Sequence, residues 1–191
     1  MKITLPNKIT VARIVMIFIF LVICNVDDKL PEQMQYPWRV TGFIFVIIAG
    51  LTDVLDGFIA RRYNLVSDFG KLMDPLADKI FIVTTFIMMV DKMILPGWVA
   101  VIILSREFMV TGLRLLAANK GEVIAADMTG KLKTLIQMIF LLVGGSIWVG
   151  WLKMENIKIL WTVSIWAVVI ITVYSGISYF VRHRYLYVTK I

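Results

Sequence analysis

The stretch GLTDVLDGFIARRYNLVSDFGKLMDPLADKI, from Gly50 to Ile80, decides how the rest of the chain is interpreted. It places five acidic residues between long apolar runs, namely Asp53, Asp56, Asp68, Asp74 and Asp78. A charged side chain at membrane depth is costly, and where it occurs it usually has a function. The stretch therefore predicts two apolar helices whose carboxylates serve a functional site.

The composition of the whole chain is that of a membrane protein. Its 191 residues are 60% hydrophobic with a mean hydropathy of +0.86, whereas soluble domains contain about 45 to 50% apolar residues. A spanning helix needs about 20 apolar residues. Suitable runs occur at residues 9–25, 38–60, 75–90, 97–117, 132–150 and 157–181. We expect an all-α, polytopic protein with a bundle of six transmembrane helices in one domain, residues 1–191.

Basic residues are distributed unequally among the connections between these runs. With the N-terminus in the cytoplasm, five of the 20 Lys and Arg residues lie outside and 15 inside; the five are Lys29, Arg39, Lys92, Lys153 and Lys158. Cytoplasmic loops are the ones enriched in Lys and Arg, so we expect both termini and the aspartates on the cytoplasmic side. The basic residues are spread over short loops without a nucleic-acid-binding motif. The net charge of +7 therefore indicates anionic lipids or phosphorylated substrates rather than nucleic acid.

The acidic stretch predicts a helical hairpin with a polar face. The first helix carries Asp53, Asp56, Gly57, Ala60 and Arg61 at offsets of 0, 3, 4, 7 and 8, which lie on one helical face. The second helix carries Asp74 and Asp78, one turn apart. If the two helices pack antiparallel, four carboxylates meet at one point.

Four carboxylates so close together need a positive partner. Two unit charges about 4 Å apart repel by about 4 kcal/mol at an effective dielectric constant of about 20. Oxygen ligands without histidine or thiol favour a hard cation such as Mg²⁺ or Mn²⁺. Gly57 and Ala60 leave room for a ligand, and Arg61 suits a phosphate. The alternative is a structural role: Asp68 in a solvated loop, and Asp74 as the cap of a helix that begins near Pro75.

The complete pattern, Asp53-x2-Asp56-Gly57-x2-Ala60-Arg61-x8-Gly70-x3-Asp74-x3-Asp78, resembles the signature of the CDP-alcohol phosphatidyltransferases at every position. The resemblance implies that Asp53, Asp56 and Asp74 hold two divalent cations, Mg²⁺ or Mn²⁺, on the pyrophosphate of CDP-diacylglycerol. Asp78 would share in cation binding or act as the base. The cytidine and phosphate pocket would be lined by Gly57, Ala60, Arg61 and Gly70. The resemblance also implies a homodimer.

Two later segments indicate the acceptor alcohol. SREFMVTGLR and GKLKT resemble the corresponding segments of bacterial phosphatidylglycerophosphate synthases, which implies transfer to sn-glycerol 3-phosphate, with CMP released, at the bacterial cytoplasmic membrane. The candidate ligands of the acceptor phosphate are Arg106, Arg114, Lys131 and Lys133, with Glu107 ordering these cations. For Arg114, Lys131 and Lys133, anchoring at the membrane surface is the alternative.

Three further alternatives are open at the level of sequence. Asn7, Thr10 and Arg13 either border the site or cap the first helix and snorkel to the interface. Another acceptor, such as serine, inositol phosphate or phosphatidylglycerol, is compatible with the aspartate signature. Intramembrane acids also line ion pathways, so a divalent-cation transporter is a rival from another functional class.

Overall fold

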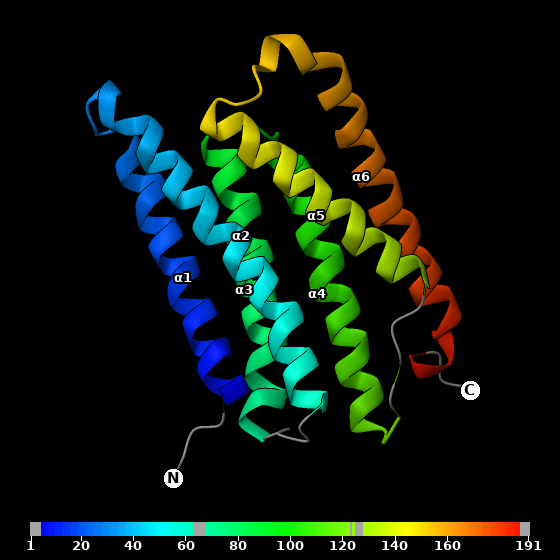
Figure 1. Ribbon diagram of the computed structural model, residues 1–191. Coiled ribbons are helices and arrows are strands. Elements are labelled where there is room, and N and C mark those ends of the chain that lie inside the picture. Colours follow the sequence, from blue (N-terminus) through cyan, green and yellow to red (C-terminus); the bar gives the residue numbers. More distant parts are fainter. Residues whose placement is uncertain (1–4, 63–67, 123, 125–127, 188–191) are drawn as a thin grey trace. The chain divides into compact units, whose positions relative to one another are not determined.

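The computed structural model describes residues 5–62, 68–122, 124 and 128–187 (Figure 1). Within the helices, it describes no side chains for residues 5–6, 53–62, 68–69, 71–72, 128–129 and 131. The helices are α1 (Leu5–Asp27), α2 (Glu32–Arg62), α3 (Asp68–Asp91), α4 (Gly97–Asn119), α5 (Met128–Val149) and α6 (Met154–Arg182). A short 3₁₀ helix, η1 (Arg184–Leu186), follows. The described residues contain no strand, which confirms the all-α prediction.

Within the part of the chain that the structure describes, four helices are long and apolar enough to cross a membrane. The candidate spans are Asn7–Asp27, Glu32–Thr52, Leu132–Val149 and Met154–Arg182. The helices α3 and α4 carry charged residues within their length, Asp74 and Asp78 on one and Arg106 and Glu107 on the other. The chain is thus a helical membrane protein, and crossing by α3 and α4 stays a prediction.

The chain divides into two compact units. The first comprises residues 1–94 and 144–152, and so contains α1, α2, α3 and the end of α5. Its core contains the Trp148 indole, which packs edge-on against the Phe20 ring with a distance of 5.8 Å between the ring centroids. A Cβ at Gly145 would lie 2.1 Å from Cε2 of Phe43, so only glycine permits this contact. Close approach of small residues lets apolar helices pack without polar contacts.

Asp27 anchors one end of the first unit. It is fully buried at the end of α1, where its two carboxylate oxygens accept hydrogen bonds from Arg39 Nε at 2.9 and 2.8 Å. Lys92 Nζ lies 4.0 Å from Asp27 and 2.6 Å from the neighbouring, exposed Asp28. This ion-pair network joins α1, α2 and Lys92, the residue that follows α3. The hydrophobic periodicity of the sequence does not predict these contacts.

We expect Asp27→Asn to destabilise the protein by about 3 kcal/mol, because breaking a buried ion pair leaves the remaining charges uncompensated. For a domain of this size the loss corresponds to a fall in Tm of about 6 to 12 °C, measured by thermal unfolding in detergent. Asp28→Asn is the matched control: it removes an exposed partner of Lys92, and a change of less than about 2 °C is expected. Equal shifts for the two variants would contradict the structural role of Asp27.

The second unit comprises residues 95–143 and 153–191, with α4, most of α5, α6 and η1. Helices α4 and α6 pack along each other around Val110, Leu113, Ala117, Tyr179 and Leu186. The Phe140 ring of α5 stacks on the Trp161 ring of α6 at a centroid distance of 4.5 Å. Helices α4 and α5 of this unit carry the basic residues of the candidate acceptor site.

The C-terminal segment is tied to the end of α4. Lys120 Nζ donates to the Leu186 carbonyl oxygen at 2.7 Å, and the Tyr185 hydroxyl donates to Glu122 Oε2 at 2.8 Å. The hydrogen bond to the Glu122 carboxylate raises the pKa of Tyr185 above its ordinary value. These contacts place the tail beside the α4–α5 connection within the second unit.

Candidate active site

The predicted acidic hairpin is present as the pair α2 and α3. Helix α2 extends to Arg62 and therefore includes Asp53, Asp56, Gly57, Ala60 and Arg61, whose side chains lie outside the described set. Their expected convergence stays a prediction. Asp74 and Asp78 lie one turn apart on α3, and both are partly buried. Gly70 is buried in the first turn of that helix.

Helix α3 begins earlier than the sequence suggested. It starts at Asp68, so Asp68 lies within the helix and Asp74 lies more than a turn inside it. The alternative that Asp74 caps this helix is wrong, because the helix continues through Pro75 despite the missing backbone N–H of proline. A carboxylate in a helix interior does not satisfy the N-terminal N–H groups, so Asp74 is available for another role.

A residue of α1 holds the Asp74 carboxylate. The Thr10 hydroxyl, which is completely buried, donates to Asp74 Oδ1 at 2.7 Å. This bond orients the carboxylate and leaves Oδ2 as a candidate cation ligand. Helix α1 thereby supplies part of the surroundings of the acidic hairpin.

Asn7 and Arg13 are buried on α1 as well. Asn7 is 7% exposed and Arg13 is 1% exposed. Arg13 Nε donates to Thr52 Oγ1 at 3.4 Å, one residue before Asp53. Arg13 therefore does not snorkel to an interface, and the alternative that these residues border the site is favoured.

Asp78 is the second described carboxylate of the hairpin, and it is accessible. Its side chain is 45% exposed and lies 3.7 Å from Lys79 Nζ. An exposed ion pair of this kind contributes about 0 to 1 kcal/mol, so it leaves Asp78 free to exchange partners. That accessibility suits either a base or a cation ligand that meets a soluble substrate.

The described donors fit a hard cation. Asp74 and Asp78 offer carboxylate oxygens, the ligands that Mg²⁺ uses in proteins. Among the side chains that the structure describes, no three acidic, histidine or cysteine residues form a metal-binding group. The predicted set of four carboxylates also needs Asp53 and Asp56, whose side chains the structure does not describe.

We expect Thr10→Val to lower the rate at limiting Mg²⁺ by about 10- to 150-fold, because a hydrogen bond to a charged group contributes about 1.5 to 3 kcal/mol. The measurement is the initial rate of CMP release over a Mg²⁺ titration, and Thr10→Ser should retain most of the rate. Thr85→Val is the matched control, since among the described residues the buried Thr85 hydroxyl contacts only carbonyl oxygens of its own helix, α3. An unchanged Mg²⁺ dependence in Thr10→Val would contradict this positioning role.

A second polar site lies among α4, α5 and α6. Glu107 of α4 is 6% exposed and pairs with Lys133 Nζ of α5. Arg106 Nη1 lies 3.5 Å from the same Glu107 oxygen, and Arg106 Nη2 donates to Ser175 Oγ of α6 at 2.6 Å. The prediction that Glu107 orders the cations is supported by both contacts.

Arg106 and Arg114 share one side of α4, as their spacing of eight residues predicts. Arg114 Nε donates to the Tyr179 hydroxyl at 3.1 Å, and Tyr179 lies one turn beyond Ser175 on α6. Arg114 is exposed, whereas Lys133 is buried. Simple anchoring at the membrane surface therefore does not describe Lys133; the side chain of Lys131 lies outside the described set.

The comparison with known proteins decides the family. The family model described as CDP-alcohol phosphatidyltransferase matches residues 3–174. The chain belongs to this family of enzymes. The match covers both the acidic hairpin and the Arg106–Glu107–Lys133 network.

Curated relatives of this CDP-alcohol phosphatidyltransferase extend over nearly its full length. A protein of Bacillus subtilis (strain 168) named CDP-diacylglycerol–glycerol-3-phosphate 3-phosphatidyltransferase is 40% identical over 190 residues, 94% of each chain. A Haemophilus influenzae protein of the same name is 34% identical, covering 94% of this chain and 92% of its own. A probable phosphatidylglycerophosphate synthase of Mycobacterium tuberculosis is 34% identical over 93% of this chain and 80% of its own.

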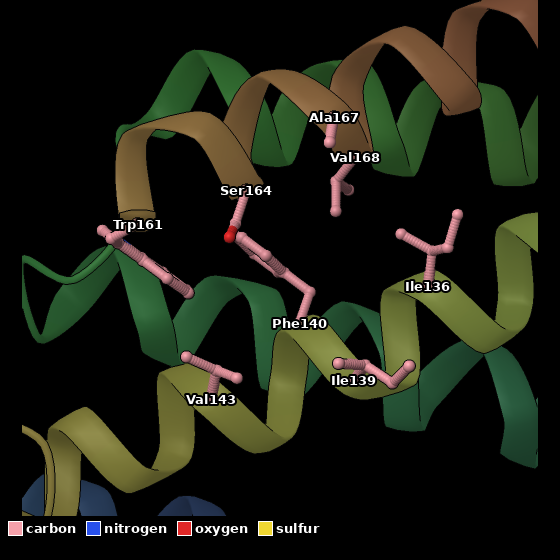
Figure 2. Close-up of a pocket in the computed structure, with 8 residues that line it drawn as sticks. All are labelled: Ile136, Ile139, Phe140, Val143, Trp161, Ser164, Ala167 and Val168. Atoms are coloured by element: carbon pink, nitrogen blue, oxygen red, sulfur yellow. The ribbon is translucent and has the colours of Figure 1, made fainter. Parts of the chain in front are cut away.

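The second unit of this phosphatidyltransferase also contains an apolar cavity of about 180 Å³ (Figure 2). The residues that line it come from α5 and α6: Ile136, Ile139, Phe140, Val143, Trp161, Ser164, Ala167 and Val168. The only hydroxyl among these eight side chains, that of Ser164, donates to the Leu160 carbonyl oxygen of its own helix. The cavity suits hydrocarbon and lacks the charged groups that a phosphate needs.

Proposed function

We propose that this CDP-alcohol phosphatidyltransferase transfers the phosphatidyl group from CDP-diacylglycerol to sn-glycerol 3-phosphate, giving phosphatidylglycerophosphate and CMP. The observation that carries the choice of acceptor is the network of partly buried Arg106 with buried Glu107 and Lys133. An acceptor that carries a phosphate, such as glycerol 3-phosphate or inositol phosphate, needs such cations, whereas serine has no phosphate to pair with them. The names of the three relatives agree with this acceptor.

At the donor site of the first unit, Asp53, Asp56, Asp74 and Asp78 would hold two divalent cations, Mg²⁺ or Mn²⁺, on the donor pyrophosphate. Bound cations of this kind stabilise the charge on the attacking and leaving oxygens of an in-line displacement. The adjoining residues that would contact the CDP moiety are Gly57, Ala60, Arg61 and Gly70. The described hydrogen bond from Thr10 to Asp74 supports this assignment by holding one of the four carboxylates in place.

The reaction is a single displacement. The acceptor hydroxyl oxygen forms a bond to the β-phosphorus of CDP-diacylglycerol, while the bond from that phosphorus to the bridging oxygen breaks. The bridging oxygen departs with CMP. The hydroxyl proton passes to a base, for which Asp78 is the candidate because of its accessibility.

At the acceptor site of the second unit, Arg106, Arg114, Lys131 and Lys133 would bind the phosphate of glycerol 3-phosphate. Glu107 limits the freedom of Arg106 and Lys133, so less conformational entropy is lost when the phosphate binds. We further propose that residues 1–191 act as one catalytic domain of a homodimer in a bacterial cytoplasmic membrane.

The acceptor assignment is tested by giving the purified protein CDP-diacylglycerol, Mg²⁺ and separate acceptors, then identifying the lipid product. The panel contains glycerol 3-phosphate, serine, inositol phosphate and phosphatidylglycerol. Phosphatidylglycerophosphate should form from glycerol 3-phosphate alone. Transfer to another member of the panel, with none to glycerol 3-phosphate, would overturn the acceptor while keeping the family. Uptake of Mg²⁺ or Mn²⁺ into proteoliposomes without CDP-lipid would favour the transporter instead.

The proposed topology puts both termini and the aspartates in the cytoplasm, where the soluble substrate is available. Single cysteines introduced in a Cys24→Ser background test it with a membrane-impermeant thiol reagent on intact cells. Asp28→Cys and Glu155→Cys should label from outside, whereas Lys120→Cys should label only after lysis. The reverse pattern would place the site on the opposite side from its substrates.

A further inference from the structure

Two buried polar side chains of the second unit have no part in the mechanism above. Gln137 of α5 is 1% exposed, and Thr172 of α6 is fully buried. Neither the amide nitrogen and oxygen of Gln137 nor the hydroxyl of Thr172 has a hydrogen-bond partner among the described residues. We call these two residues the inner polar pair.

Thr172 differs from the other helical threonines of its unit whose side chains the structure describes. Thr111, Thr134 and Thr162 each donate to a carbonyl oxygen four residues earlier in the same helix. The Thr172 hydroxyl makes no such bond within the described chain. Its own helix therefore leaves this hydroxyl available to a ligand.

We call Arg106, Glu107 and Lys133, with the Ser175 contact of Arg106, the basic network. Each residue of the inner polar pair lies one helical turn from a residue of this network. Gln137 follows Lys133 by four residues on α5, and Thr172 precedes Ser175 by three on α6. On α5 the step from Lys133 to Gln137 leads away from the α4–α5 connection. On α6 the step from Ser175 to Thr172 leads away from the C-terminal tail. One turn is about 5.4 Å, so a small molecule held by Lys133 and Arg106 can also reach the next polar side chain.

An unsatisfied buried polar group normally destabilises a protein, and hydrocarbon around a helix bundle provides no substitute partners. Gln137 Nε2, Gln137 Oε1 and Thr172 Oγ1 are three such atoms. Their presence near the basic network is explained if a ligand completes their hydrogen bonds. A phosphate offers only acceptors to the Gln137 amide and would leave its oxygen unsatisfied. An alcohol both donates and accepts, so it matches the amide and the Thr172 hydroxyl.

We propose that Gln137 and Thr172 bind the non-reacting secondary hydroxyl of glycerol 3-phosphate and thereby select a glycerol backbone. This inference rests on the proposed function: the basic network binds the phosphate, the primary hydroxyl reacts, and the inner polar pair recognises the remaining polar group. The pair makes the site specific for a phosphorylated polyol rather than for any phosphorylated alcohol.

The test compares kcat/KM for glycerol 3-phosphate with that for 3-hydroxypropyl phosphate, which keeps the phosphate and primary hydroxyl but lacks the secondary hydroxyl. The wild-type enzyme should prefer glycerol 3-phosphate by about 10- to 100-fold, since an analogue without the secondary hydroxyl leaves a buried polar group unsatisfied. In Gln137→Leu the preference should fall below about 3-fold, through loss of efficiency with glycerol 3-phosphate alone. Thr172→Val should lower the preference as well and provides the test if Gln137→Leu does not fold.

Thr162→Val is the matched control, because Thr162 is exposed on α6 and bonds its own helix; its substrate preference should equal that of the wild type. An unchanged preference in both Gln137→Leu and Thr172→Val, or an equal loss with both substrates, would overturn the inference. Equal use of the two substrates by the wild type would do the same and leave the proposed function standing. Failure of the wild type to use glycerol 3-phosphate at all would instead overturn the proposed function.

Discussion

Replacing Asp74 with asparagine is expected to reduce CMP release from CDP-diacylglycerol by at least about 10³-fold. The substitution keeps the shape of the side chain and its contact with Thr10 but removes the negative charge that would hold a cation. Cation binding at a transferring phosphoryl group contributes several kcal/mol to transition-state stabilisation, and each 1.36 kcal/mol is about tenfold in rate. Asp53→Asn and Asp56→Asn should have effects of the same size, and Asp78→Asn should also lose most activity.

The matched control is Asp91→Asn, which makes the same chemical change at the other end of α3. Asp91 has a largely exposed side chain 4.0 Å from Lys92 Nζ, so its replacement should change the rate by less than about twofold. Rates are measured as CMP formed over a titration of Mg²⁺ and, separately, of Mn²⁺. Near wild-type turnover of Asp74→Asn at saturating cation would show that the proposed cation site is wrong.

Removing a cation of the second site should have the next largest effect. Arg106→Ala is expected to lower kcat/KM for glycerol 3-phosphate by about 10- to 150-fold, from the loss of about 1.5 to 3 kcal/mol in charge-assisted hydrogen bonds. Lys133→Met should lower it at least as much, because Lys133 is buried against Glu107. The kinetic parameters for CDP-diacylglycerol should change much less than those for the acceptor.

A double variant separates acceptor binding from folding. Lys133→Met leaves the Glu107 carboxylate buried without this partner, which costs about 3 to 5 kcal/mol of stability. Glu107→Gln combined with Lys133→Met removes both charges, so Tm should recover while kcat/KM for glycerol 3-phosphate stays low. Lys158→Met, on an exposed position of α6, is the control for loss of a surface charge. Recovery of both Tm and activity in the double variant would assign Lys133 a structural role only.

The sequence predicted the helices well because apolar runs of this length have few alternative structures. The helix ends were less accurate where proline occurs. The run at 38–60 omitted the first turn of α2, which begins at Glu32 and continues through Pro37, and α3 begins at Asp68 ahead of Pro75. Proline removes one hydrogen bond but does not end a helix whose other contacts are retained.

The candidate site was predicted in part. Spacing placed Arg106 and Arg114 on one face of α4, and their contacts with Ser175 and Tyr179 of α6 confirm it. Spacing did not reveal that Thr10 would meet Asp74, 64 residues away, because periodicity describes one helix and not its neighbours. Spacing also failed to distinguish Lys133, which is buried, from Lys131, the other basic residue near the start of α5.

Gln137 and Thr172 were missed for a related reason. In the sequence each is a single polar residue within an apolar run, and such residues are frequent on lipid-facing or packed helices. Only their burial without described partners distinguishes them. A search for Gln one turn from a basic residue would have found Gln137, whereas Thr172 has Ser175 and no basic residue one turn away.

The most direct test of the central claim is the stoichiometry of the reaction catalysed by the purified protein. CMP and phosphatidylglycerophosphate are quantified together in one reaction containing CDP-diacylglycerol, glycerol 3-phosphate and Mg²⁺. The account predicts equal molar amounts of the two products, with neither formed when glycerol 3-phosphate is omitted or the cation is chelated. Release of CMP without formation of phosphatidylglycerophosphate would contradict it.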